Sequence, residues 1–216
     1  MTTDDRLPST SAIADVLALR GGNGWLTPPL QPVVPADRPV AGRAVTVRIE
    51  HRPSGASFAP MYDLLSSDHS GEVLIIAGAH AIPGAIWGEI LSTAAAGAGF
   101  IGVALDGTAR DISTLRTGDL PLYATSTGIA GPQGSAHLAA VGESVSIGAV
   151  QIEGGDLIVI DDGGCVRIPA ADATSIVADA LAYEDAEAEV LAALDRGEPL
   201  TSAYRHKADV VARLRR

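Results

Sequence analysis

An uninterrupted apolar run, followed by a helical pattern and a second apolar run, constrains the fold of this chain more than any other feature. The first run covers residues 73–78 and the second covers residues 100–105. Short runs of this kind are typical of strands that are covered on both faces. Between them, residues 81–98 repeat apolar side chains at helical spacing, with glycines loosening the beginning. The pattern predicts a β-α-β crossover in which residues 73–78 form a central strand and Asp106-Gly107 closes the second strand.

The remaining sequence predicts helices at both ends of the chain and short strands after the crossover. Residues 25–40 contain five prolines, which favours an extended crossing segment over regular structure. Residues 141–169 alternate apolar and polar side chains between glycine turns, and they predict four short strands. The expected architecture is therefore α/β, with parallel strands in the middle and an antiparallel meander after them. The other expected elements are helices at Thr10–Leu19, 60–66, 170–196 and 202–215, and strands at 41–48 and 120–124.

Length and composition favour one domain over residues 1–216. The chain has 216 residues, of which 47% are hydrophobic and 19% are charged, and this suffices for one core. The net charge of −11 repels phosphate backbones, so no nucleic-acid partner is expected. No apolar stretch reaches the ~20 residues that span a bilayer, and the sequence begins with polar residues rather than an apolar leader. We therefore expect a cytoplasmic protein that does not associate with membranes.

Two further observations argue against thiol chemistry and dinucleotide binding. Cys165 is the only cysteine, which excludes disulfides within the chain and thiolate metal sites and favours a buried structural role. Residues 97–102 match the pattern GxGxxG, but a dinucleotide site requires this motif after a strand and at the start of a helix. Here the glycines end a helix and lead into a strand, so we interpret them as a C-cap and a close-packing turn.

The strongest functional signal comes from residues 87–91, Trp-Gly-Glu-Ile-Leu, and the later pair Arg110-Asp111. A helix and a strand fill the interval between Glu89 and Arg110, so the helix start and the strand end are expected at the same edge of a sheet. Two carboxylates and one guanidinium suit a divalent cation with an anionic, oxygen-rich substrate. Two simpler alternatives are a structural ion pair between Glu89 and Arg110 and an Asp111 that only caps the following helix.

Other residues near this edge are candidates with competing interpretations. His80 is expected beside the site and is a candidate substrate contact, although a loop histidine satisfied by the backbone is the commoner case. Trp87 is expected to form a wall of the pocket or, slightly favoured, to fill a subunit interface. Asp106, Asp161 and Asp162 precede glycines and are interpreted as turn formers.

Five motifs along the chain, at residues 10–15, 42–47, 87–89, 107–111 and 155–164, carry a resemblance to a known family. With them the chain resembles the RraA-like family, which includes class II 4-hydroxy-4-methyl-2-oxoglutarate/4-carboxy-4-hydroxy-2-oxoadipate aldolases and relatives that decarboxylate oxaloacetate. The resemblance implies a three-layer swivelling β/β/α domain that assembles as trimers or hexamers with active sites between subunits. The helices of residues 170–216 are then expected at a subunit interface.

The resemblance also implies roles for individual residues. Asp111 matches the family's metal-binding aspartate and Arg110 its substrate-binding arginine, while Glu89 takes the place of the acid that holds a metal-bound water. Glu187 lies ten residues before Gly197, where a family glutamate reaches the metal-bound water in the neighbouring subunit, although Glu184 and Glu189 compete for this role. Shortly after the Arg-Asp pair the family's aldolases carry an acid where this chain has Thr114, which leaves the aldol step and the substrate open.

The chemistry follows from the residue types. A 2-oxo acid chelated to Mg²⁺ or Mn²⁺ loses a carbon–carbon bond when the cation stabilises the pyruvate enolate that remains. Asp111 is expected to hold the ion and Arg110 to clamp a substrate oxygen. The N–H groups at the helix start, those of Gly88, Ile90 and Leu91, are expected to receive the substrate carboxylate.

These expectations describe a metal-dependent pyruvate aldolase or oxaloacetate decarboxylase. The alternative from a different class is a non-catalytic RraA-like protein that binds and inhibits a ribonuclease complex. Such relatives tend to lack the aspartate of the pair, so the presence of Asp111 together with Glu89 favours the enzyme.

Overall fold

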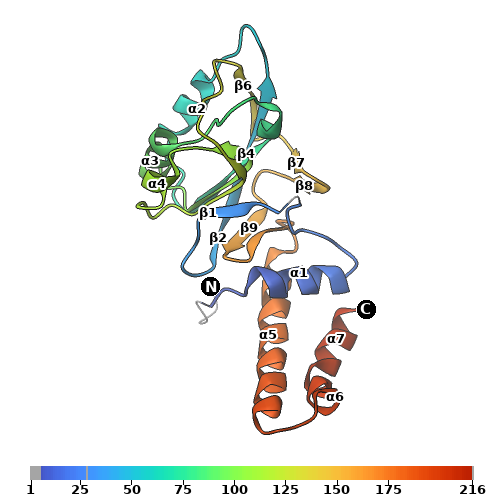
Figure 1. Ribbon diagram of the computed structural model, residues 1–216. Coiled ribbons are helices and arrows are strands. Elements are labelled where there is room, and N and C mark those ends of the chain that lie inside the picture. Colours follow the sequence, from blue (N-terminus) through green and yellow to red (C-terminus); the bar gives the residue numbers. More distant parts are fainter. Residues whose placement is uncertain (1–5, 28, 216) are drawn as a thin grey trace.

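The computed structural model describes residues 6–27 and 29–215, and an eight-stranded sheet is its central element (Figure 1). The strand order is β1-β5-β4-β3-β2-β9-β10. Strand β6 lies off this path and pairs with the C-terminal half of β2, past the residues of β2 that pair with β9. A separate hairpin joins β7 and β8. The strands are β1 (Gln31–Val34), β2 (Val40–His51), β3 (Glu72–Ala77), β4 (Gly102–Ala109), β5 (Leu122–Thr127), β6 (Ala136–Val141), β7 (Val145–Ile147), β8 (Val150–Ile152), β9 (Leu157–Asp161) and β10 (Gly164–Ile168). The helices are α1 (Thr10–Leu19), α2 (Ala59–Leu64), η1 (Ala79–Ala81), α3 (Glu89–Gly97), α4 (Ile112–Leu115), α5 (Ala173–Asp195), α6 (Leu200–Ala203), η2 (Tyr204–Lys207) and α7 (Ala208–Leu214).

The predicted parallel crossover is confirmed at the centre of this sheet. Strand β3 pairs in parallel with β2 and β4, and β4 pairs in parallel with β5. Five of the six residues of β3 are buried, as the apolar run predicted for a strand covered on both faces. The remaining pairings are antiparallel, including the meander that follows β5. The proline-rich segment contributes one short strand, β1, to the edge beside β5.

Two predicted boundaries in the crossover are wrong. Helix α3 begins at Glu89 rather than near residue 81, because Pro83 donates no hydrogen bond and Gly84 has φ of +118°, a value that no helical residue adopts. Strand β4 does not close at Asp106-Gly107 but continues to Ala109. Gly107 is required for close packing rather than for a turn, since a Cβ there would lie 2.7 Å from the Cβ of Ala79.

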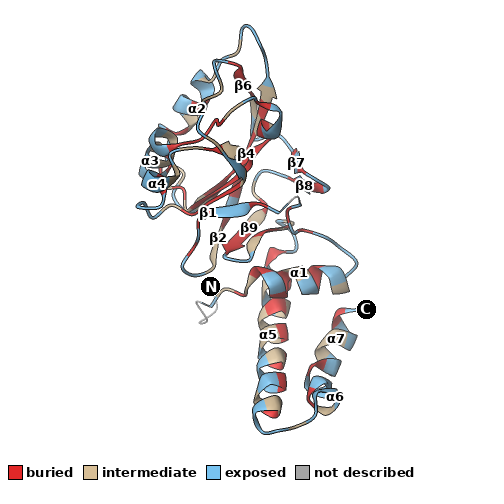
Figure 2. Cartoon of the chain, viewed as in Figure 1, coloured by how far each residue is buried: buried red, intermediate tan, exposed pale blue. Residues whose placement is uncertain are grey.

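The expected three-layer β/β/α arrangement is confirmed. Helices α2, α3 and α4 lie on one side of the sheet and the β7–β8 hairpin lies on the other (Figure 1). The strands between them are buried along most of their length (Figure 2). One apolar cluster joins the sheet to α2 and α3, and a second joins its opposite face to the β7–β8 hairpin.

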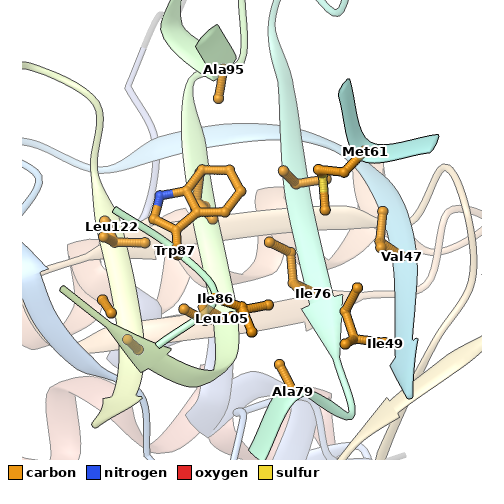
Figure 3. Close-up of a cluster of buried hydrophobic side chains, with 14 of the residues drawn as sticks. Val47, Ile49, Met61, Ile76, Ala79, Ile86, Trp87, Ala95, Leu105 and Leu122 are labelled. Carbon is orange, nitrogen blue, oxygen red and sulfur yellow. The ribbon is translucent and has the colours of Figure 1, made fainter. Parts of the chain in front are cut away.

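Trp87 belongs to the first of these clusters rather than to a pocket wall or a subunit interface. Its side chain is fully buried and lies among Ala95, Leu105 and Leu122 (Figure 3). The indole Nε1 donates a hydrogen bond to Oγ of Ser92 at 2.7 Å. The interpretation of Trp87 as an interface residue is therefore wrong for this side chain.

Several predicted local structures are confirmed. Helix α1 has its predicted bounds and is capped by Ser9, whose Oγ accepts a hydrogen bond from the N–H of Ala12. Gly99 follows the end of α3 with φ of +90°, which is the C-cap role expected from the glycine pattern. Cys165 is buried in β10, and burial raises the pKa of its thiol. Asp161 accepts the N–H of Gly163, as a turn former does, and also binds the N–H of Thr10 at the start of α1.

The C-terminal helices project from the sheet as an antiparallel pair, α5 and α7, with α1 lying across their upper end (Figure 1). Lys207 is buried between them, where Nζ lies 2.5 Å from Oε1 of Glu187 and 4.1 Å from the centre of the Tyr183 ring. The hydroxyl of Tyr183 donates to Oδ2 of Asp15 in α1 at 2.8 Å. None of the helices formed by residues 6–27 and 29–215 is long and apolar enough to cross a membrane.

Replacing Tyr183 by Phe should lower the free energy of unfolding by about 0.5–1.5 kcal/mol, because it removes the hydrogen bond to Asp15 and keeps the ring beneath Lys207. Chemical denaturation measures the change. Tyr204→Phe is the matched control, since Tyr204 is exposed and its hydroxyl makes no hydrogen bond to any residue within 6–27 and 29–215. Equal stabilities of the two variants would show that the α1–α5 contact does not depend on this bond.

Candidate active site

The two motifs singled out in the sequence meet at the carboxyl end of the parallel strands. Arg110 and Asp111 follow directly after β4, and Gly88 immediately precedes α3. The backbone N–H of Arg110 donates to the carbonyl oxygen of Trp87 at 2.8 Å, and Trp87 pairs with Ala109 like a short additional strand. This pairing fixes the Arg-Asp pair beside the first turn of α3. Crevices at this edge of an α/β sheet are the usual location of ligand sites.

Asp111 adopts a conformation that turns its carboxylate toward α3. Its φ of 60° and ψ of 37° lie in the left-handed region, which aspartate tolerates better than most residues. Oδ2 accepts a hydrogen bond from the N–H of Glu89 at 3.3 Å. No described residue donates a hydrogen bond to Oδ1, and Asp111 makes no side-chain capping bond to α4. The alternative of a simple cap for α4 is therefore wrong, and one carboxylate oxygen is left for a ligand.

Gly88 is required by the space that Asp111 and Arg110 occupy. A Cβ at this position would lie 2.5 Å from Oδ2 of Asp111 and 3.1 Å from Cγ of Arg110. The φ of −163° is ordinary extended backbone, so the requirement is for space and not for conformation. The side chains of the Arg-Asp pair therefore pack directly against the backbone that begins α3.

Arg110 is held close to Asp111 and leaves the end of its guanidinium for a ligand. Nε lies 3.7 Å from Oδ2 of Asp111. A Cβ built on Gly131 would lie 3.2 Å from Nη1 of Arg110, so the guanidinium lies over the backbone of Gly131. Within residues 6–27 and 29–215 neither Nη1 nor Nη2 makes a hydrogen bond, and Arg110 forms no ion pair with Glu89. The proposed structural ion pair between these two residues is not observed.

A pocket of about 330 Å³ opens in front of the Arg-Asp pair. Arg110, Asp111 and Gly88 lie close together in its lining, and most of the other lining residues are apolar. The start of α3 also contributes Ile90 and Leu91 to the lining. The lining residues are Phe58, Tyr62, Ala85, Ile86, Gly88, Ile90, Leu91, Arg110, Asp111, Pro132, Gly134 and Ala136.

Glu89 donates its backbone N–H to Asp111 but does not line the pocket. It lines an adjoining groove of about 320 Å³ between α3 and α4, together with Ser92, Thr93 and Thr114. The predicted meeting of two carboxylates in one cleft is thus not observed, because Glu89 does not line the pocket. Thr114, the position at which the chain departs from the family's aldolases, lies in the same groove as Glu89.

His80 and Glu187 lie away from the residues just described. Nδ1 of His80 lies 2.6 Å from Oδ2 of the buried Asp106, which also accepts the N–H of Gly78. The partner of His80 is thus a carboxylate rather than the backbone, Asp106 is not a turn former, and His80 is absent from the pocket lining. Glu187 is on α5, where it pairs with Lys207 in the same chain.

The residues fit a hydrated magnesium or manganese ion better than a metal held entirely by protein. No group of three histidine, cysteine, aspartate or glutamate side chains within residues 6–27 and 29–215 is arranged to hold a metal. Mg²⁺ keeps several waters and commonly binds through one or two carboxylates together with its substrate. Oδ1 of Asp111 is a carboxylate oxygen suited to such an ion. The side chain of Asp111 is 41% exposed and lines the pocket.

The apolar wall was missed in the sequence. Phe58 and Tyr62 come from α2 and its start, far from both motifs in the chain, and Pro132 and Gly134 come from the loop after β5. One signal was present. The chain has only two phenylalanines and four tyrosines, and one of each stands four residues apart at the predicted short helix, where they share a face.

Comparison with known proteins places these features in a family. A family model described as RraA-like, Aldolase/RraA, matches residues 10–167. A protein of Halalkalibacterium halodurans named "Putative 4-hydroxy-4-methyl-2-oxoglutarate aldolase" is 30% identical over 167 residues, covering 77% of this chain and 75% of that protein. Protein DlpA of Legionella pneumophila is 24% identical over 165 residues, and the matched region spans only 27% of its length.

Solved structures share the fold. An uncharacterized protein from Pseudomonas syringae pv. tomato superposes with a TM-score of 0.81 at 28% identity, covering 92% of this chain and 89% of that one. Streptomyces coelicolor RraAS2, described as an unusual member of the RNase ES inhibitor RraA protein family, superposes with a TM-score of 0.72 at 25% identity, covering 83% and 89%. Aldolase and ribonuclease inhibitor are thus among the names that similar proteins carry.

Proposed function

Since this chain belongs to the RraA-like family, we propose that it is a divalent-metal-dependent lyase that breaks a carbon–carbon bond in 2-oxo acids and releases pyruvate. The observation that carries the proposal is the placement of Asp111, Arg110 and the start of α3 around one pocket. The reactions in question are retro-aldol cleavage of 4-hydroxy-2-oxo acids and decarboxylation of oxaloacetate. Both leave the same enolate on the pyruvyl part.

The residues divide the binding of the pyruvyl part between them. Asp111 and, through water, Glu89 would hold Mg²⁺ or Mn²⁺, which when bound acts as a Lewis acid toward the 2-oxo acid. Arg110 binds a substrate oxygen through its two unpartnered terminal nitrogens. The first N–H groups of a helix have no partner within it, so those of Ile90 and Leu91 receive the substrate carboxylate.

In the retro-aldol reaction the C3–C4 bond breaks and its electron pair remains on C3 as the enolate. The C4 hydroxyl loses its proton and becomes the carbonyl of the second product. We assign this proton to Glu89, which lines the adjoining groove and would act through an intervening water. The proton then returns to C3 and completes pyruvate. Decarboxylation requires no such base, because carbon dioxide leaves without a hydroxyl proton.

The proposal is tested by measuring pyruvate release from oxaloacetate and a panel of 4-hydroxy-2-oxo acids, with Mg²⁺, with Mn²⁺ and with a chelator. Metal-dependent release from at least one substrate, above the rate of the metal alone, is the expected result. Release from none would overturn the lyase and favour the other function represented among similar proteins, binding to a ribonuclease complex.

Replacing Arg110 by Ala should lower kcat/KM for both reactions by about 10- to 100-fold, because a hydrogen bond to a charged group contributes roughly 1.5–3 kcal/mol. Steady-state pyruvate release measures the effect. Arg116→Ala is the matched control, since Arg116 is an exposed arginine in the following turn and does not line the pocket. A loss confined to one of the two reactions would contradict a role in binding the shared pyruvyl part.

We further propose that the protein assembles as a trimer or hexamer in which α5 lies beside a neighbouring site. Exposed Leu191, Leu200 and Tyr204 on the C-terminal helices support an interface there. Glu187, on α5, pairs with Lys207 through Oε1. Its side chain is partly exposed, so it is available to a neighbouring subunit. Sedimentation at micromolar concentration tests the assembly, and a monomer would contradict it.

A further inference from the structure

The pocket in front of the Arg-Asp pair is chemically divided. Its charged side chains, Arg110 and Asp111, lie beside each other and are used by the pyruvyl part in the proposed reaction. The walls beyond them come from α2, from the segment before α3 and from the start of α3. They are formed by Phe58, Tyr62, Ile86, Ile90, Leu91 and Pro132.

Two aromatic rings organise this apolar part. The centroids of Phe58 and Tyr62 lie 6.0 Å apart with an interplanar angle of 75°, an edge-to-face pair. The pair is held by α2, whose Met61 is fully buried in the core. The rings therefore form a fixed wall on a packed helix rather than a loop that adapts to its ligand.

Much of the apolar surface around the pocket is uncovered. Tyr62 is 57% exposed and Ile90 is 79% exposed, although both line the pocket. Covering such surface is favourable in proportion to the apolar area removed from water. An apolar group that extends from the pyruvyl part would cover these two side chains.

Among the described residues of this chain, the walls beyond the Arg-Asp pair offer no cationic partner to a charged group in the same position. Arg110 is the only cationic side chain among the described residues that line the pocket, and the polar ends of the lining are otherwise those of Tyr62 and Asp111. A second carboxylate on the substrate would lose water without gaining an ion pair from these walls. The wall therefore selects against diacids.

We infer that the substrate is a 4-hydroxy-2-oxo monoacid that carries an apolar, aromatic substituent at C4. This inference rests on the proposed lyase function and specifies its substrate class. With 4-hydroxy-2-oxo-4-phenylbutanoate, breaking the C3–C4 bond leaves its electron pair on C3, and the C4 hydroxyl proton is transferred to C3. The products are pyruvate and benzaldehyde, and no oxidant or reductant is consumed. The ring lies against Phe58 and Tyr62, and the 2-oxo acid lies at Arg110.

The experiment compares pyruvate release from 4-hydroxy-2-oxo-4-phenylbutanoate and from 4-hydroxy-4-methyl-2-oxoglutarate, a diacid, with oxaloacetate as a third substrate. We expect kcat/KM for the phenyl substrate to exceed that for the diacid by at least about tenfold, since one wall of matched apolar contacts discriminates on this scale. Equal rates, or a faster diacid, would overturn the inference and leave the lyase intact. Pyruvate from none of the three would overturn the lyase itself, and the inference with it.

Two exposed aromatic side chains, Tyr62 and Trp25, provide a pair of variants. Tyr62→Arg places a cation on the apolar wall, and it should lower kcat/KM for the phenyl substrate and raise it for the diacid, each by about tenfold. Trp25→Arg places the same cation at another exposed aromatic position, at 40% exposure and outside the pocket, and should leave the ratio of the two substrates unchanged. Because Tyr62 is exposed, its variant should fold, which the melting temperature checks. An unchanged ratio in a folded Tyr62→Arg protein would overturn the inference.

Discussion

Replacing Asp111 by Asn should lower kcat/KM for pyruvate release by about a thousandfold or more. A bound cation contributes several kcal/mol to an enolate-forming step, and each 1.36 kcal/mol is a factor of ten in rate. Asparagine retains the shape of the side chain and, like aspartate, tolerates the left-handed backbone that position 111 requires. The melting temperature should therefore change little, which separates loss of the ligand from loss of the fold.

A second measurement on the same variant does not depend on turnover. If Asp111 holds the ion, Mn²⁺ should raise the melting temperature of the wild-type protein, because a ligand that binds only the folded state stabilises it. The rise should disappear in Asp111→Asn and persist in Asp162→Asn, a control at an exposed aspartate outside the pocket. Wild-type turnover in Asp111→Asn, or an equal Mn²⁺ effect in all three proteins, would remove Asp111 as the ligand.

Adding a single methyl group at Gly88 should be nearly as damaging to activity. In Gly88→Ala the new Cβ would lie 2.5 Å from Oδ2 of Asp111, far inside van der Waals contact, so the carboxylate has to move. A displacement of about 1 Å in a catalytic group costs on the order of a hundredfold in rate. We expect at least this loss in kcat/KM, with a small change in stability because both side chains of the Arg-Asp pair are partly exposed.

Gly97→Ala is the control for this variant. Gly97 is the last residue of the same helix, and a Cβ there would meet no atom within 4 Å. Alanine in a helix is more favourable than glycine by roughly 1 kcal/mol, so this variant should be as active as wild type and at least as stable. Full activity in Gly88→Ala would mean that the close approach of Asp111 to α3 has no part in the reaction.

The sequence predicted those elements whose local pattern and tertiary environment agree. Helix α1 was found to the residue, since its cap and its apolar face are both local signals. The central strand β3 was found because burial on both faces leaves an unbroken apolar run. The continuation of β4 through Gly107 was not found, because the reason for that glycine is the Cβ of Ala79 from another element. Asp106-Gly107 usually indicates a turn, but here packing against Ala79 explains the glycine and the strand continues.

The site was predictable only in its backbone framework. Gly88, Arg110 and Asp111 were expected at one edge because a helix start and a strand end meet there in a β-α-β unit. The orientation of side chains at that edge is not predictable from the sequence, and Glu89 lines the adjoining groove rather than the pocket. The sequence does not predict that Tyr62 lines the pocket, because this contact depends on how α2 packs over the sheet, and such packing joins segments far apart in the chain.

The reactivity of Lys207 can report how often the C-terminal helices separate. It is the only lysine in the sequence, and its side chain is 8% exposed between the C-terminal helices. An amine-acylating reagent can therefore reach an ε-amino group only when these helices separate from each other. The rate of acylation at Lys207 then measures how often the helices open. A decrease of this rate with increasing protein concentration would show that neighbouring copies hold the helices closed.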